Sequence, residues 1–232
     1  MTVFYTENIL QTNVLDESES FHCTKVLRMK TNEKVQVIDG RGNLYNARIV
    51  FPHSKHTKIE ILSAQNEFEK RDYYLHLAIA PTKSIERLEW CVEKAVEIGV
   101  DVITPLLCEF SERKIVKIER LEKIMISAVK QSLKAYLPKL NPMTDFNDFI
   151  NQIDENQRFI AHCHNSPKEP LFKICKPKES TLIMIGPEGD FSEQEIENTI
   201  NQNFKPVSLS KSRLRTETAG IVAVNTIALA NT

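Results

Sequence analysis

Five short apolar runs separated by polar and helix-like segments limit what this 232-residue chain can fold into. Each run is long enough for a buried strand, and helical spacing of apolar residues recurs between them. Such alternation predicts an α/β fold, a mainly parallel sheet with helices on both faces, because parallel neighbours need a crossover connection. The expected strands are residues 74–80, 102–107, 158–163, 181–185 and 207–209.

Capping signals predict where the helices begin and end. Ser84 is placed to cap a helix that Gly99 stops. Ser192 followed by Glu195 forms a capping box. A long helix is expected over residues 117–136, ended by Pro138. The first helix should bury one stripe: Ile85, Leu88, Val92, Ala95 and Val96.

The first 68 residues have a different pattern and predict a small β-barrel. Strands with period-two alternation are expected at residues 34–39, 44–50 and 58–62, with turn residues between the first two. The polar segment 66–72 is the expected linker. The predicted domains are therefore residues 1–68 and 73–232.

Charge is unevenly distributed between these parts. The whole chain carries a net charge of −1, but residues 21–60 contain eight Lys or Arg against three Asp or Glu. A basic barrel on a near-neutral protein is a candidate for contacting RNA phosphates. The alternative is a solvated surface balanced by acids elsewhere, and composition does not decide between them.

Other features narrow the class of protein. The chain begins with no signal-peptide pattern, and no apolar run approaches the roughly 18–20 residues that span a bilayer. Its five cysteines are dispersed, which favours a reduced, cytoplasmic setting. His162 and His164 resemble a metal tract, but alternate strand residues face opposite ways, so no metal is expected. Trp90 can stack a base, although helix packing is favoured, and His22 is taken as structural.

The last fourteen residues, 219–232, contain no charged side chain. A helix that is apolar all round must be buried, yet this one is too short to cross a membrane. We expect it to pack inside the domain, against a second subunit, or both.

Each of the last two expected strands is followed by a polar loop. Residues 185–190 read Ile-Gly-Pro-Glu-Gly-Asp, and residues 209–219 read Leu-Ser-Lys-Ser-Arg-Leu-Arg-Thr-Glu-Thr-Ala. Loops at the carboxyl ends of parallel strands bind ligands, and glycines let a ligand approach the backbone. Each loop also has an ordinary interpretation: the first as a strand-to-helix turn, the second as a helix start capped by Thr216 or Thr218.

The order and spacing of these loops resemble the RsmE family of 16S ribosomal RNA uridine-N3 methyltransferases. A Gly-Pro-Glu-Gly turn about two dozen residues before Leu-Arg-Thr-Glu-Thr-Ala is the family pattern. Further matches are Phe-His-Cys-Thr-Lys-Val-Leu-Arg at 21–28, Lys-Ala-Val-Glu-Ile-Gly-Val at 94–100, Ser-Glu-Arg at 111–113 and Lys-Gln-Ser-Leu-Lys at 130–134. The departures are Asp190 and Ser210, where glycine is usual, and Lys134, where arginine is usual.

The resemblance implies a SPOUT-type domain with a trefoil knot, preceded by a PUA-like barrel that binds RNA. It implies a homodimer that uses S-adenosylmethionine to methylate a uridine of the small ribosomal subunit. The implied cofactor-binding residues are Ile185, Gly186, Glu188, Gly189, Leu209, Ser210, Leu214, Arg215, Thr216, Thr218 and Ala219. The implied RNA contacts are Lys25, Arg28, Arg113 and Lys134.

Two residues are candidates for the chemistry of methyl transfer. Arg215 is the candidate for stabilising negative charge on the uracil. Glu217 is the nearest carboxylate for a general base, or else it pairs with Arg213 or Arg215 as structure. Two alternatives stay open: a ribosome-assembly or RNA-binding protein without turnover, and a methyltransferase of the same class acting on another RNA.

Overall fold

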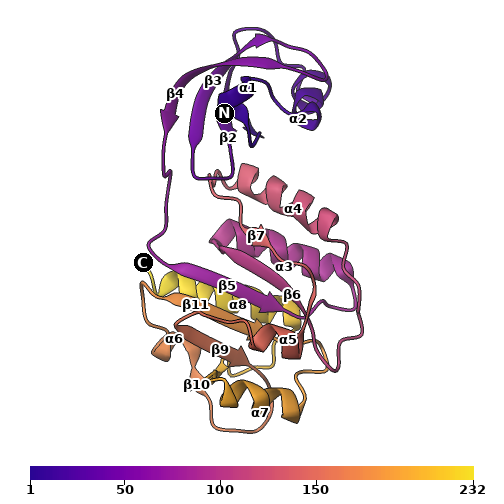
Figure 1. Cartoon of the computed structure of the whole chain (residues 1–232), viewed down its shortest axis with the longest axis vertical. Coiled ribbons are helices and arrows are strands. Elements are labelled where there is room, and N and C mark those ends of the chain that lie inside the picture. Colours follow the sequence, from indigo (N-terminus) through magenta and orange to yellow (C-terminus); the bar gives the residue numbers. More distant parts are fainter. The chain divides into compact units, whose positions relative to one another are not determined.

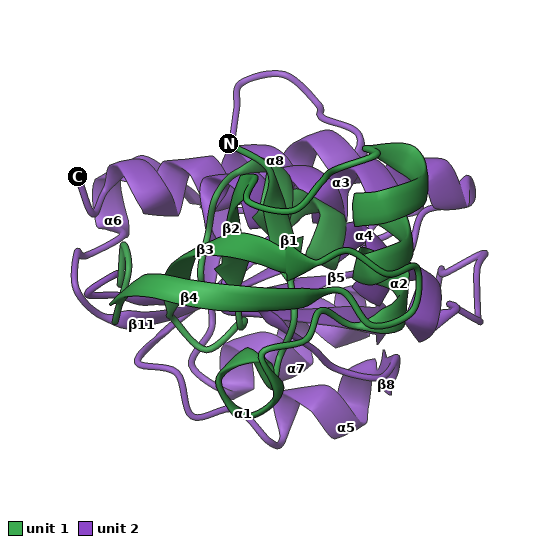
Figure 2. Cartoon of the chain, turned by 90° about the horizontal axis from the view of Figure 1, so that it is seen from above, with its two compact units in different colours: residues 1–70, 126–137 green, residues 71–125, 138–232 purple.

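The computed structural model describes residues 1–232, which divide into two compact units (Figure 2). Unit 1 comprises residues 1–70 and 126–137, and unit 2 comprises residues 71–125 and 138–232. The division after residue 70 lies in the polar segment 66–72 of the sequence. A second segment, residues 126–137, belongs with the first unit although it comes from the middle of the chain. No helix is both long and apolar enough to span a membrane.

Unit 1 is built on a four-stranded sheet in the order β1-β2-β3-β4. β1 runs parallel to β2, and the other pairs are antiparallel. The chain near Leu15 pairs with the start of β4, and the amide of Asp16 donates to the Thr6 hydroxyl beside β1. The predicted barrel is thus closed by a short bridge between its edges rather than by a full strand. Its strands are β1 (Val3–Tyr5), β2 (Lys34–Ile38), β3 (Leu44–Phe51) and β4 (Lys58–Gln65).

Three short helical segments cover this sheet: α1 (Ile9–Thr12), α2 (Glu17–Phe21) and the π-turn η1 (His22–Val26). The core beneath them is apolar, with Phe4 and Tyr45 fully buried. Arg28 follows η1 with φ at 54°, a left-handed conformation that is uncommon for a side-chain-bearing residue. The amide of Met29 then donates to the Cys23 carbonyl, which ends the turn.

Unit 2 is the predicted α/β domain (Figure 1). Its main sheet has the order β10-β12-β9-β11-β5-β6-β7, and every pairing is parallel. β8 pairs separately with the end of β6. The strands are β5 (Tyr74–Ile79), β6 (Val102–Leu107), β7 (Lys139–Leu140), β8 (Thr144–Asp145), β9 (Gln157–Ala161), β10 (Glu169–Pro170), β11 (Ser180–Ile185) and β12 (Lys205–Ser208).

Helices cover both faces of this sheet, as predicted. α8 (Thr216–Leu229) packs on α3 (Ile85–Ile98) and on β5 and β11. On the opposite face, α5 (Phe146–Ile150) and α7 (Glu193–Asn201) bury Phe146 and Ile196 against Leu182 and Met184 of β11. Successive residues of a strand face opposite sides, so β11 supplies both cores. The remaining helices are α4 (Ile118–Gln131) and α6 (Leu171–Ile174).

The predicted ends of two helices are confirmed. Gly99 stops α3 with φ at 129°, and the predicted buried stripe is confirmed for Leu88, Val92, Ala95 and Val96. Ser192 and Glu195 form the expected capping box at α7. Ser84 occupies the N-cap position of α3, but its hydroxyl donates to the Glu86 carboxylate instead of capping the helix.

The helix predicted over residues 117–136 is shorter than expected. α4 ends at Gln131, and Leu133 takes a left-handed φ of 53°. The amide of Lys134 donates to the Val129 carbonyl, and that of Leu133 to Lys130. These bonds form a Schellman motif, which normally uses glycine at the left-handed position. Pro138 therefore does not end the helix, and the prediction missed the motif because leucine stands where glycine is usual.

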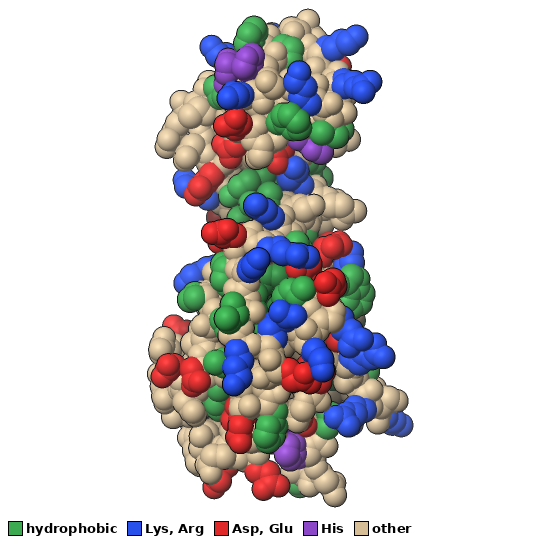
Figure 3. Space-filling model, turned by 90° about the vertical axis from the view of Figure 1, so that its right-hand side faces the viewer, with side chains coloured by type: hydrophobic (Ala, Val, Ile, Leu, Met, Phe, Trp, Pro, Cys, Tyr) green, Lys and Arg blue, Asp and Glu red, His purple; other side chains and the backbone are tan.

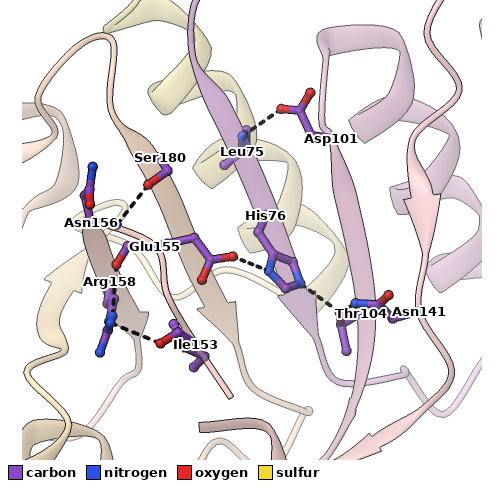
Figure 4. A network of polar contacts seen from close by, with 10 residues as sticks. All are labelled: Leu75, His76, Asp101, Thr104, Asn141, Ile153, Glu155, Asn156, Arg158 and Ser180. Carbon is purple, nitrogen blue, oxygen red and sulfur yellow. Dashed lines mark hydrogen bonds and ion pairs between the residues drawn. The ribbon is translucent and has the colours of Figure 1, made fainter. Parts of the chain in front are cut away.

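A buried polar network links residues on β5 and β6 to residues just before β9 and just after β7 (Figure 4). His76 Nδ1 lies 2.7 Å from Glu155 Oε1, and its Nε2 lies 2.7 Å from Thr104 Oγ1. Asn141 donates to the same Thr104 oxygen at 2.8 Å. Both ring nitrogens of His76 and the Thr104 hydroxyl are therefore engaged within the network. The network is therefore structural, since it leaves none of these His76 atoms available to a ligand.

Glu195 joins the capping box to a second loop. Its Oε2 accepts from the Ser192 amide and its Oε1 from the Glu109 amide, both at 2.8 Å. Because Glu195 is buried, its removal leaves two backbone donors without partners.

We expect Glu195→Ala to lower the free energy of unfolding by about 2–3 kcal/mol, against about 1 kcal/mol for Ser192→Ala. Urea denaturation measures both. Glu193→Ala, in the same turn, is the exposed control, and equal losses in all three variants would contradict this role.

Candidate active site

A cleft of about 790 Å³ lies at the carboxyl ends of β9, β11 and β12. Three loops form its walls, one after each strand, and Arg87 of α3 adds to the rim. This is the edge at which parallel sheets bind ligands. Because β9 and β11 are neighbours and β12 lies beside β9, the strand order brings together loops that are far apart in the sequence.

Most of the residues that the family pattern assigns to the cofactor line this cleft. Gly189 and Thr218 do not. Neither does Glu217, a catalytic candidate, although Arg215 does. The assigned residues that line the cleft are Ile185, Gly186, Glu188, Leu209, Ser210, Leu214, Arg215, Thr216 and Ala219.

The glycines of the first loop are required by packing. A Cβ on Gly186 would lie 3.1 Å from the Phe191 ring, and one on Gly189 would lie 2.9 Å from Phe110 Cβ. Neither glycine has a positive φ. The space of a Cβ at these two positions is therefore filled by protein side chains, while Gly186 itself lines the cleft.

Asp190 connects two walls of the cleft. Its backbone adopts a left-handed φ of 68°, a conformation that aspartate tolerates better than most residues. Its Oδ2 accepts from the Cys163 amide at 2.7 Å and its Oδ1 from the Phe191 amide at 2.9 Å. The carboxylate thus ties the loop after β9 to the loop after β11. A glycine, usual in the family at this position, has no side chain to make these bonds.

Thr216 connects the second loop to the first. Its hydroxyl donates to the Gly186 carbonyl at 3.1 Å. Arg215 occupies the N-cap position of α8, and no side chain caps that helix. The prediction that Thr216 or Thr218 caps α8 is therefore wrong, because Thr216 lies within the helix and bonds across to the loop after β11.

The loop after β9 was missed as part of the site. β9 ends at Ala161, so His162 and His164 lie beyond the strand and do not alternate across it. Their rings approach with centroids 5.7 Å apart, contrary to the prediction that they face opposite ways. Lys168 Nζ donates to the His162 carbonyl at 2.9 Å. No sequence signal marked this segment, because its position depends on β9 lying between β11 and β12.

The residues predicted to contact RNA, and Trp90, lie outside the cleft. Lys25 and Arg28 are exposed on unit 1, whereas Lys134 is half-buried there. Arg113, in unit 2, donates to the carbonyls of Thr82 and Lys83 at 3.1 and 2.6 Å. Trp90 on α3 is 47% exposed, so the prediction of helix packing for its side chain is wrong.

Comparison with known proteins identifies the family. Residues 69–228 match the RNA methyltransferase domain, and residues 15–62 match the RNA methyltransferase PUA domain. The ribosomal RNA small subunit methyltransferase E of Buchnera aphidicola is 32% identical over 96% of this chain and 91% of its own length. The chain belongs to the ribosomal RNA small subunit methyltransferase E family.

Solved structures of this family show the same fold. The "probable rRNA-methyltransferase" of Porphyromonas gingivalis is 38% identical, with a TM-score of 0.93 over 100% of this chain and 98% of that one. The family member from Neisseria gonorrhoeae, bound to S-adenosyl methionine, is 28% identical, with a TM-score of 0.84 over 97% and 95%. These likenesses confirm the fold class predicted by the resemblance.

His162 is the least satisfied polar side chain of the cleft region. It is 7% exposed, and neither ring nitrogen has a hydrogen-bond partner. Burial, with the nearby charge of Lys168, lowers its pKa to about 4. The imidazole is therefore neutral at pH 7.

This depressed pKa predicts acid sensitivity. Between pH 6.5 and about 4 the unfolded chain binds a proton at His162 that the folded chain does not, so the free energy of unfolding falls as the pH falls. We expect His162→Phe to remove up to roughly 3 kcal/mol of that fall. Urea denaturation of both proteins from pH 8 to pH 4 measures it. Parallel curves over the whole range would show that His162 does not carry this dependence.

Proposed function

We propose that this chain uses S-adenosylmethionine to methylate N3 of a uridine in the RNA of the small ribosomal subunit. The observation that carries the proposal is the cleft at the strand ends, lined by nine of the eleven residues that the family pattern assigns to the cofactor. The family member from Neisseria gonorrhoeae is bound to S-adenosyl methionine, which supports the same cofactor here.

The residues of the cleft fit such a cofactor. Its lining combines apolar residues, which suit an uncharged adenine ring, with charged residues, which suit the amino-acid end of the cofactor. No phosphate-binding Gly-Lys-Ser/Thr follows the Gly-Pro-Glu-Gly turn, in keeping with a cofactor that has no phosphate. Ile185, Leu209 and Ala219 would hold the nucleoside half. When bound, the cofactor supplies an electrophilic methyl group on a sulfonium.

The chain's own residues would position the uracil and accept its N3 proton. Breaking the sulfur–methyl bond and forming the N3–methyl bond releases the N3 proton and neutral S-adenosylhomocysteine. The Arg215 guanidinium has no ion pair within the chain and lines the cleft, so it stabilises negative charge on the uracil. Glu217 accepts the proton: it is 7% exposed, its Oε2 has no partner, and its Oε1 lies 3.8 Å from Arg87 Nε.

We infer that the crossing of residues 209–215 forms the trefoil knot expected of the SPOUT class. After β12 the chain returns across the ends of the neighbouring strands to reach α8. The bond from Thr216 to Gly186 supports this path.

RNA binding by unit 1 is the second part of the proposal. Lys25 and Arg28 are exposed there, and the match to the PUA domain supports an RNA-binding role. On the face shown in Figure 3, Lys and Arg side chains lie among Asp and Glu rather than in one basic patch. Affinity would then come from a few local phosphate contacts.

We also propose a homodimer that acts in the cytoplasm, where ribosomal RNA is found. From residue 219 onward α8 carries no charge, yet Leu229 is 63% exposed and Ile221 and Val222 are only half-buried. A second copy that covers this face would remove the apolar surface from water.

Calorimetry and mass spectrometry test the function. The wild-type chain should bind S-adenosylhomocysteine and restore 3-methyluridine to 16S RNA from a strain that lacks the enzyme. Glu217→Gln should bind the cofactor product normally but lose about 100-fold or more in turnover, as expected for removal of a general base. Normal turnover in this variant would remove Glu217 from the chemistry. Absence of S-adenosylhomocysteine binding in the wild type would contradict the whole proposal.

Substitution of Arg28 tests whether unit 1 binds RNA while unit 2 binds the cofactor. Its left-handed backbone favours asparagine as the neutral replacement, because asparagine tolerates that conformation. We expect Arg28→Asn to weaken RNA binding several-fold and to reduce its salt dependence, with S-adenosylhomocysteine binding unchanged. The control is Arg41→Asn, since Arg41 already pairs with Glu7 at 2.7 Å. Filter binding over a salt series measures the effect, and loss of cofactor binding as well would count against separate roles.

A further inference from the structure

A second groove, of about 620 Å³, adjoins the cofactor cleft in unit 2. Four residues line both: Arg87, Arg213, Leu214 and Arg215. α3 and the start of α8 supply the other walls. The two cavities therefore adjoin along the loop before α8.

The groove combines an aromatic surface with unused hydrogen-bonding groups. Trp90 lines it and is 47% exposed, and its indole N–H has no hydrogen-bond partner. Glu217 also lines it, with Oε2 buried and unpartnered. The buried, unpartnered Glu217 oxygen is costly to keep, and a planar ligand that stacks on the indole and donates a hydrogen bond would satisfy it.

The charges of the groove favour an anionic ligand. Its lining contains three arginines against two glutamates. Arg213 and Arg215 make no ion pair within the chain, whereas Glu86 accepts from the Ser84 hydroxyl and Glu217 faces Arg87. Two unpaired guanidinium groups thus remain for a phosphate or for charge on a base.

We propose that this groove binds the acceptor nucleotide of the RNA, with the uracil stacked on Trp90 and its phosphate held by Arg213. This inference rests on the proposed function and names the site of its second substrate. Stacking on Trp90 would position the uracil so that its N3–H meets the Glu217 carboxylate. The methyl group would then pass from the cleft to the groove between Leu214 and Arg215.

Trp90 is the only tryptophan of the chain, so its fluorescence reports directly on the groove. The full-length protein, saturated with S-adenosylhomocysteine, is titrated with uridine 5′-monophosphate. We expect saturable quenching of Trp90 emission, no quenching by ribose 5-phosphate, which has no base, and weaker binding of uridine, which has no phosphate. Absence of quenching while S-adenosylhomocysteine binds would overturn the proposal.

Variants separate stacking from a structural role. By calorimetry, Trp90→Ala should bind uridine 5′-monophosphate at least about fivefold more weakly, and Trp90→Phe should retain most of the affinity. Phe172→Ala is the matched control, because Phe172 is 68% exposed on α6 and lines neither cavity. S-adenosylhomocysteine affinity should stay unchanged in all three variants.

Three results would count against the groove as the acceptor site. Equal affinities in Trp90→Ala and Phe172→Ala would remove Trp90 from nucleotide binding. A Trp90→Ala protein that elutes as a smaller species in size-exclusion chromatography, with nucleotide affinity unchanged, would identify the groove as a contact between copies of the chain. Failure of the wild type to bind S-adenosylhomocysteine would instead reject the proposed function, and this inference with it.

Discussion

The return of the chain from β12 to α8 is the constraint on which the candidate active site depends. Residues 209–215 cross the ends of neighbouring strands, and the Thr216 hydroxyl bonds to the Gly186 carbonyl at 3.1 Å. Close packing of α8 holds the other end of this path. A Cβ on Gly220 would lie 2.8 Å from Cys91 Sγ and 2.9 Å from Ile79 Cδ1, so α8 lies against α3 and β5 only because residue 220 is glycine.

The walls of the cleft are held together by polar side chains and packed by aromatic ones. Asp190 bonds to the amide of Cys163 in the adjacent loop, and Phe191 and Phe110 fill the space beside the two glycines. The Gly-Pro-Glu-Gly turn is thus a packing motif in this structure. The ligand surface is supplied by the loops that this packing positions, which explains how a rigid site is built from irregular backbone.

Two adjoining cavities on one side of unit 2 suit a reaction with two substrates. The cleft and the groove share three arginines, and the groove adds an indole and a buried carboxylate. Arg215 and Leu214 lie on the boundary and face both. Direct methyl transfer needs the two reactants in contact and in line, so the two ligands would have to meet where the cavities adjoin at Leu214 and Arg215.

Much of the architecture could be predicted from the sequence because it follows from local patterns. Alternating strands and helices specified the parallel sheet, Gly99 and the Ser192–Glu195 box marked helix ends, and the motif order identified the family. Local patterns failed where a distant partner decided the outcome. Leu133 takes the position usually held by glycine, Thr216 bonds across to Gly186, and Trp90 is exposed instead of packed. His162 joined the cleft only through the strand order, which places β9 between β11 and β12. The sequence by itself therefore determined the elements and the family, while tertiary structure decided which loops meet, because neighbours across a parallel sheet are chosen by packing and not by sequence distance.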